Sequence, residues 1–132
     1  MKKILAFGAS NSSTSINKTL AVFAANQLKD VTITIADLND YASPLYSVDL
    51  EKQSGIAKEA MKFYSLINAN DAIIVSVAEY NGLHTSAFKN LWDWLSRIPM
   101  EKPMNIWGGK PMFLLSASPS RRPQNNVLQV SK

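Results

Sequence analysis

Hydrophobic and polar positions follow two different periods along the chain, and the strongest pattern lies at residues 72–98. Residues 72–77 are a short apolar run rich in Ile and Val, which is typical of a central strand covered on both faces. The run ends in a polar turn at residues 79–82. The next apolar positions keep to one side of a helix. They are Phe88, Leu91, Trp92, Leu95 and Ile98.

The same patterns predict the other elements. Further strands are predicted at residues 3–7, 31–36 and 111–115. Further amphipathic helices are predicted at residues 16–28 and 56–67. Loops are predicted at residues 37–49 and 99–110, and residues 116–132 begin as a loop and continue as part of a helix from residue 125. Strands alternating with helices predict an α/β fold with a parallel sheet and right-handed crossovers, in a single domain over residues 1–132.

Composition narrows the classes of function. The chain is 46% hydrophobic and 18% charged, as in ordinary globular proteins, and it has no cysteine. Disulfides and thiol chemistry are therefore excluded, and any electron transfer requires a bound cofactor. The net charge of +4 arises in residues 97–132, which carry six Lys or Arg and one Asp or Glu. We expect no nucleic-acid face, whereas a basic patch for a phosphorylated ligand remains an alternative.

The first residues and the single histidine also carry expectations. The apolar start is interrupted at Gly8, and it is too short for a secretory leader or a membrane span. We therefore expect a cytoplasmic protein that does not enter a membrane.

No metal site is expected, because no other metal-ligating residues are grouped with His84. Its expected place is the surface or the start of a helix.

A polar loop follows the first strand, where a helix start offers free N–H groups to an anion. The loop lacks the three glycines of a dinucleotide fingerprint and the second glycine of a P-loop before Lys18 and Thr19. It also lacks the acidic residues that a receiver domain has after its first strand. Its hydroxyls and amides predict a phosphomonoester held by neutral hydrogen bonds. The alternative is a Ser-rich helix cap without a ligand.

The turn at residues 79–82 allows two interpretations. In an open α/β sheet, ligands bind at the carboxyl edge, where this turn is expected to lie. The alternative is a turn that only caps the following helix, since turns favour these residue types.

Taken together, several ordered motifs resemble the NADPH-dependent FMN reductase family, which are flavodoxin-like flavoenzymes that include azo-, quinone- and chromate-reducing members. They cover essentially the whole chain. The motifs are Gly8…Ser15-Ile16-Asn17, Asp37-Leu38…Tyr41…Pro44-Leu45-Tyr46, Glu79-Tyr80-Asn81-Gly82, Lys89-Asn90…Asp93-Trp94…Ser96-Arg97, Gly109-Lys110-Pro111 and Ser116-Ala117-Ser118-Pro119.

The resemblance implies a doubly wound parallel sheet of order 2-1-3-4-5, with FMN at the switch point between strands one and three. The FMN phosphate would be held by Ser10, Asn11, Ser12, Ser15, Asn17 and the backbone N–H of Ile16. The isoalloxazine ring would be bordered by Glu79, Tyr80, Asn81 and Gly82, with Ser116, Ala117 and Ser118 on its other side.

The resemblance also implies an activity, in which hydride passes from NAD(P)H to FMN. The electrons then pass to a small-molecule acceptor: a quinone, an azo compound, a metal oxyanion or free flavin. No side chain is assigned as catalytic, and a homodimer or homotetramer is expected. The alternative is a flavodoxin-like FMN-binding module, either an electron carrier or a shortened homologue with weak or no turnover. A carrier would be expected to be acidic, which this chain is not.

The chain departs from the family pattern at several positions. Ala78 stands where the family usually has Pro, and Asn11 where Arg is frequent. Residues 120–124 replace several glycines of the third loop. The sequence ends at residue 132, before the fifth strand that the family pattern leads one to expect, so we expect the order 2-1-3-4.

The positions of Trp94 and Glu79 are predicted individually. Trp94 is predicted to lie beside the core stripe of its helix and to be free for a subunit interface, whereas Trp92 lies on the stripe. Glu79 is expected to contact the ring edge or a second subunit.

Overall fold

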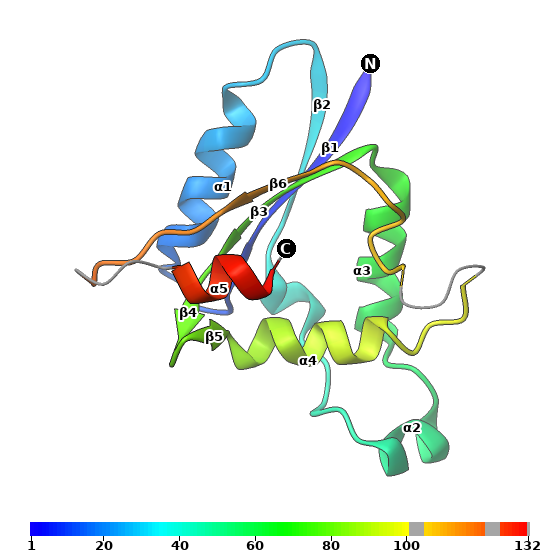
Figure 1. Ribbon diagram of the computed structural model, residues 1–132. Helices are drawn as coiled ribbons and strands as arrows, with labels where there is room; N and C mark the ends of the chain where they lie inside the picture. The colour runs from blue at the N-terminus through cyan, green and yellow to red at the C-terminus, as the bar shows by residue number, and fades with distance from the viewer. Residues whose placement is uncertain (101–104, 121–124, 132) are drawn as a thin grey trace.

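A parallel sheet forms the centre of the molecule (Figure 1), and the computed structural model describes residues 1–100, 105–120 and 125–131. The sheet has the order β2-β1-β3-β6, which is the predicted order 2-1-3-4. Its strands are β1 (Lys2–Ala9), β2 (Val31–Ala36), β3 (Ala72–Val77) and β6 (Met112–Leu115). Pairing is parallel throughout, with Ile4 of β1 opposite Ala72 of β3 and Ile73 of β3 opposite Met112 of β6. The α/β prediction is therefore confirmed.

Helices cover both faces of this sheet (Figure 1). They are α1 (Ile16–Asn26), α2 (Val48–Ser54), α3 (Lys58–Ala69), α4 (Ser86–Leu95) and α5 (Asn125–Val130), with a 3-10 helix η1 (Leu38–Tyr41). Alternate residues of each central strand face opposite ways, because side chains in a strand have a period of two. Ile4, Ala6 and Ile74 pack against α1, whereas Phe7 and Val75 pack in the core on the side of α3 and α4.

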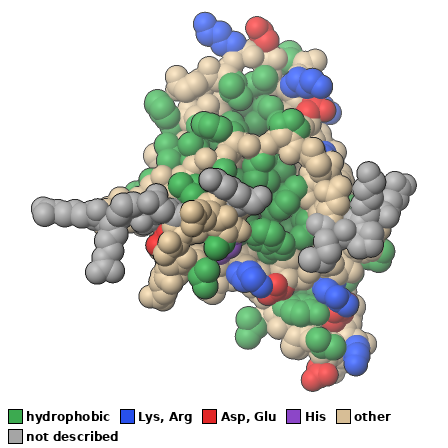
Figure 2. All heavy atoms as spheres, in the orientation of Figure 1, with side chains coloured by type: hydrophobic (Ala, Val, Ile, Leu, Met, Phe, Trp, Pro, Cys, Tyr) green, Lys and Arg blue, Asp and Glu red, His purple; other side chains and the backbone are tan. Residues whose placement is uncertain are grey.

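The core is larger on the side of α3, α4 and α5. Phe7 lies at its centre, with ring centroids 5.2 Å from Phe63 of α3 and 6.2 Å from Phe88 of α4. Figure 2 shows hydrophobic side chains gathered in the middle of this face, between α5 and α3. Such aromatic pairs contribute about 1 kcal/mol each beyond the burial of apolar area.

Two loops contain more regular structure than the sequence predicted. Residues 37–49 include η1 and the start of α2, whose first turns are capped by Asp37 and Ser47. The polar turn at residues 79–82 lies in a hairpin of β4 (Glu79–Tyr80) and β5 (Leu83–His84). Asn81 and Gly82 have φ values of 53° and 81°, which a tight hairpin turn requires and which Asn and Gly adopt most readily.

The prediction for Trp94 is wrong, because this side chain is 1% exposed. Its indole N–H donates to the carbonyl oxygen of Pro44 at 2.7 Å, and its ring packs edge-on against Tyr46 at 5.1 Å. The loop that carries these two residues is held on α4 by Asn90, which accepts from Tyr46 N at 2.8 Å. A loop about 50 residues earlier in the chain therefore covers Trp94, and helical spacing alone could not show this.

Candidate functional site

A hollow of about 300 Å³, with serine, threonine and asparagine residues in its lining, lies at the carboxyl edge of the sheet beside the ends of β1 and β3. This is the place where the strand order reverses direction, and open α/β sheets bind ligands there. Three segments form its wall: the loop before α1, residues 78–80 and residues 117–119. Segments about 100 residues apart in the sequence thus meet at one site.

Most of the predicted site residues line this hollow. They are Ser10, Ser12, Ser15, Ile16, Asn17, Glu79, Tyr80, Ala117 and Ser118. Asn11 lines a separate hollow of about 160 Å³ beside η1 and α4, and Asn81, Gly82 and Ser116 are outside the lining. Thr14, Ala78 and Pro119 belong to the lining but were not predicted. The predicted contacts of all these residues with a flavin stay predictions.

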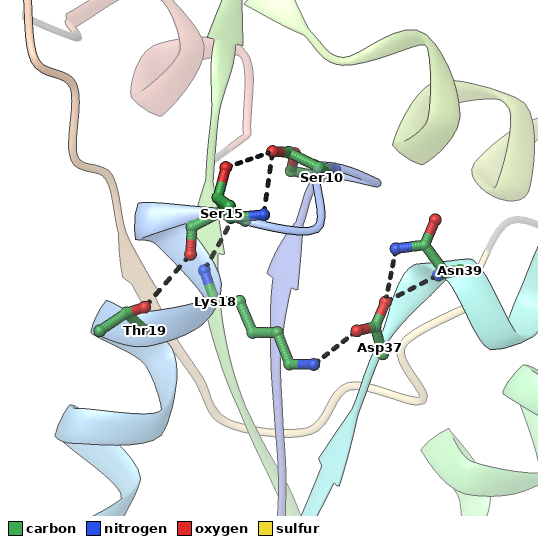
Figure 3. A network of polar contacts seen from close by, with 8 residues as sticks. Ser10, Ser15, Lys18, Thr19, Asp37 and Asn39 are labelled. Atoms are coloured by element: carbon green, nitrogen blue, oxygen red, sulfur yellow. Dashed lines mark hydrogen bonds and ion pairs between the residues drawn. The ribbon is translucent and has the colours of Figure 1, made fainter.

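Hydroxyl groups shape the loop before α1 (Figure 3). Ser10 Oγ accepts a hydrogen bond from Ser12 N at 3.1 Å, and Ser12 Oγ accepts from Thr14 N at 3.3 Å. Ser15 caps the helix, its Oγ accepting from Lys18 N at 3.2 Å. A hydroxyl that accepts from the backbone keeps its own proton, so it can still donate to an anion. The loop can therefore serve as a helix cap and as a set of donors at once.

Gly8 allows this loop to sit close to the sheet. A Cβ atom at position 8 would lie 2.4 Å from Lys18 N and 2.6 Å from Lys18 Cα. Contacts that short with backbone atoms do not occur, so any larger residue would displace the first turn of α1. The glycine thus places the positive end of the α1 dipole directly over the end of β1, where it favours an anion.

Lys18 forms an ion pair with a neighbouring carboxylate, that of Asp37 (Figure 3). Its Nζ atom lies 2.5 Å from Asp37 Oδ2, and Asp37 Oδ1 accepts from Asn39 N at 2.9 Å. The hydrogen bond from Lys18, followed by the one from Asn39 N, lowers the pKa of Asp37 below its usual value. The ammonium group that is nearest in sequence to the hydroxyl loop is therefore paired with a carboxylate at the end of β2.

The β4–β5 hairpin borders the hollow and is fixed from two directions. Glu79 Oε2 accepts from the backbone N–H of Val127 in α5 at 3.1 Å. Thr85 Oγ1 donates to the carbonyl oxygen of Ala9 at 2.9 Å and accepts from Phe88 N, so it links the hairpin, α4 and the end of β1. Thr85 is fully buried and was missed by sequence reasoning. Its helix-cap position before α4 was the available signal.

The loop after β6 completes the wall. Ser116 Oγ donates to the carbonyl oxygen of Val77 at 2.6 Å. Both polar backbone groups of Ala117 bond to the side chain of Asn17, at 2.9 and 3.0 Å. Ser118 Oγ accepts from Ser120 N at 3.0 Å. Of residues 120–124, which the resemblance predicts to replace glycines, residues 121–124 lie outside the described residues.

A second and larger hollow differs in chemistry. It measures about 640 Å³ and lies between α1, β3 and β6, with a lining that is apolar apart from Gln27. Apart from the amide of Gln27, the side chains of this lining offer a phosphate no hydrogen-bond donor. The smaller hollow is therefore the candidate site, although it is not the largest concave region.

The residues at the smaller hollow fit a flavin phosphate and ring. Neutral hydroxyl donors and a helix N-terminus surround one end of the hollow, which is the donor set that a phosphomonoester requires. Residues 78–80 of the hairpin segment and residues 117–119 belong to the same lining and can border a flat ligand. No helix in the described part of the chain is long and apolar enough to cross a membrane.

Comparison with known proteins identifies the family of the chain. The profile of the family described as NADPH-dependent FMN reductase matches residues 2–132. The quinone reductase of Escherichia coli (strain K12) is 31% identical over 85 residues, which are 64% of this chain and 40% of that relative. The matched segment therefore spans about two fifths of the curated relatives.

Solved structures show the same fold. FerB, a flavoenzyme NAD(P)H:(acceptor) oxidoreductase from Paracoccus denitrificans, aligns with a TM-score of 0.78 and 22% identity, over 100% of this chain and 69% of that one. The apo form of the NADH:FMN oxidoreductase EMOB aligns with a TM-score of 0.64 and 16% identity, over 98% and 65% of the two chains. On the match over residues 2–132, the chain belongs to the NADPH-dependent FMN reductase family.

Proposed function

We propose that this protein is an NAD(P)H-dependent flavin oxidoreductase that binds FMN in the hollow at the carboxyl edge of the sheet. The observation that carries the proposal is the meeting of the hydroxyl loop, the start of α1 and two further loops at the switch point. FMN, when bound, accepts hydride from a nicotinamide and delivers electrons to a second substrate. Its acceptor class would be a quinone, an azo compound, a metal oxyanion or free flavin.

The protein's own residues would bind and orient. Ser10, Ser12 and Ser15 would donate hydrogen bonds to the phosphate, supported by the dipole of α1. Residues 78–80 and 117–119 would border the ring and limit its movement. We assign no side chain as nucleophile, acid or base, so the protein would contribute position and the electrostatic field around the ring.

We also propose a homodimer or homotetramer in the cytoplasm. Tyr80 and Leu83, on the hairpin beside the site, are 48% and 58% exposed, and a second copy of the chain would cover this apolar surface. Sedimentation at several protein concentrations would test this proposal, and a monomer at all of them would contradict it.

Flavin titration tests the function. The wild-type protein is expected to bind FMN more tightly than riboflavin and to oxidise NADPH when a quinone is present. Ser12→Ala combined with Ser15→Ala should weaken FMN binding about tenfold or more with little change for riboflavin, because two phosphate donors are lost. Ser65→Ala, which removes an exposed serine hydroxyl on α3, is the matched control and should change neither.

Each outcome has a distinct meaning. Equal losses for both flavins would contradict the phosphate assignment. Absence of flavin binding by the wild-type protein would contradict the proposed function. Tight FMN binding without NADPH oxidation would favour the alternative, an FMN-binding module.

A further inference from the structure

Asn17 is only 3% exposed, although it lies in the first turn of α1 and lines the hollow. Its side chain forms hydrogen bonds to two other segments of the chain. Its Oδ1 atom lies 2.7 Å from Ser76 Oγ on β3 and 2.9 Å from Ala117 N, and its Nδ2 atom lies 3.0 Å from Ala117 O. One amide thus joins α1, β3 and the loop after β6.

The backbone of Ala117 fixes which way this amide points. The N–H of Ala117 needs an acceptor and its carbonyl needs a donor, so Oδ1 must face the first and Nδ2 the second. The hydroxyl of Ser76, which is fully buried, must then donate to Oδ1. Both lone pairs of Oδ1 are therefore filled within the protein, and only one N–H of the amide remains for any other contact.

The location explains why such a link exists. The ladder between β3 and β6 ends at the pair Ser76 and Leu115, so Ala117 lies two residues beyond the last paired position. Beyond that point Asn17 bonds both backbone groups of Ala117, as a neighbouring strand would. The backbone of Ala117 is thereby held by α1, whereas Ser116 just before it is held to the end of β3 by its hydroxyl.

We propose that Asn17 is a positioning residue that sets the wall formed by Ala117 and Ser118 relative to the hydroxyl loop. This inference rests on the proposed function for its effect on flavin binding. It assigns Asn17 a role that acts through the backbone of Ala117, and it assigns Ser76 the role of orienting Asn17. The phosphate end and the ring end of the site are then mechanically connected through one side chain.

Flavin affinities distinguish this role from a direct phosphate contact. Asn17→Ala is expected to weaken FMN and riboflavin by the same factor, about tenfold, since the ring wall is common to both ligands. Ser76→Ala should weaken both by about threefold although Ser76 does not line the hollow, and it also serves if Asn17→Ala does not fold. A loss for FMN alone, or no loss for either flavin, would overturn the inference.

Asn70 provides the matched control. It is buried to the same degree, 4% exposed, and its Nδ2 atom donates to Leu66 O at 2.8 Å just before the opposite end of β3. Asn70→Ala removes a buried amide of the same type and lowers stability without touching the hollow. Both flavin affinities should keep their wild-type values in this variant. If Asn70→Ala lost as much flavin affinity as Asn17→Ala, the effect of Asn17→Ala would be explained by general destabilisation, and the inference would be overturned.

A flavin-free measurement separates this inference from the proposed function. Hydrogen exchange of the Ala117 amide should be about tenfold faster in Asn17→Ala than in Asn70→Ala at matched global stability, because Oδ1 is its acceptor. If the wild-type protein bound neither flavin, the proposed function would fail while this exchange comparison still decided whether Asn17 holds the loop. Equal exchange in the two variants would overturn the inference.

Discussion

At the amino edge of the sheet, Lys110 Nζ donates hydrogen bonds to the backbone carbonyl oxygens of Ile67, Asn68 and Asn70, at the end of α3. At the carboxyl edge, hydroxyl groups of residues 10–15 line an open hollow. The first edge therefore uses a cation to satisfy free carbonyls of a helix terminus, which stabilises the fold. The second edge directs donors into space that a ligand can fill. Variants at the amino edge should lower stability alone, whereas a variant that displaces the carboxyl edge should lower both stability and flavin affinity.

The largest effect is expected at the carboxyl edge, from Gly8→Ala. The added Cβ would meet backbone atoms of Lys18 at 2.4 and 2.6 Å, so α1 must shift. We expect the free energy of unfolding to fall by about 3 kcal/mol and flavin affinity to be lost as well. Urea unfolding and flavin titration measure the two effects.

Gly109→Ala is the control for this change. Nothing lies within 4 Å of a Cβ at position 109, and only the φ of 68° opposes a side chain there. A cost of about 1 kcal/mol with normal flavin affinity is expected. Equal costs at the two glycines would show that close approach to α1 is not the reason for Gly8.

Thr85→Val should produce the next largest effect. Valine keeps the shape of the side chain but leaves the carbonyl of Ala9 and the N–H of Phe88 without their buried partner. The expected loss in the free energy of unfolding is about 2 kcal/mol by urea titration. Thr32→Val, at an exposed position of β2 where valine is favoured, should change stability by less than about 0.5 kcal/mol. A Thr85→Val protein as stable as wild type would contradict the proposed bracing of the hairpin.

Lys110→Met tests the amino edge. The variant removes the ammonium group from three carbonyl oxygens while keeping most of the apolar stem. We expect about 1 kcal/mol lower stability, with unchanged affinity for both flavins. Lys62→Met, in an exposed ion pair with Glu59 at 3.8 Å, should change neither quantity measurably. A loss of flavin affinity in Lys110→Met would break the separation between the edges.

The smallest expected effect is on the pH dependence of the free energy of unfolding. Burial, and then the charge of Lys89, lower the pKa of His84 below 6.5. The unfolded chain therefore binds a proton more readily than the folded protein does. Stability should be complete above pH 6.5 and should decline as the pH falls from 6.5 through the folded pKa. His84→Gln should flatten that decline in unfolding experiments between pH 7 and 5, and an unchanged slope would contradict this assignment.

Local patterns predicted the elements of the sheet well. The predicted bounds of β2 and β3 are those of the structure, because alternation in the first and a continuous apolar run in the second are sufficient signals. The short elements η1 and α2 were missed, since each is too short to show a hydrophobic period. Trp94 was misplaced because its cover comes from Pro44 and Tyr46, which no helical pattern contains.

The candidate site shows the same division between local and long-range information. Hydroxyls at Ser12 and Ser15 follow a recognisable strand-loop-helix order, so the loop could be predicted from residue types. The bonds of Asn17 to Ser76 and Ala117 join residues 59 and 100 positions apart. Such pairings depend on how the strands are ordered in the sheet, and no spacing in the sequence encodes them.

The register of the sheet has a consequence for how the site comes into being during folding. Lys2 pairs with Val31, whereas Ile4 pairs with Ala72, a separation of 68 residues. Closing the longer loop costs more chain entropy, and this cost arises before the stabilising contacts between the strands can form. We therefore expect β1–β3 pairing to form after β1–β2 pairing. The candidate hollow depends on the ends of both β1 and β3. A nascent chain that has completed only its first β-α-β unit therefore has the hydroxyl loop but not yet a ligand site.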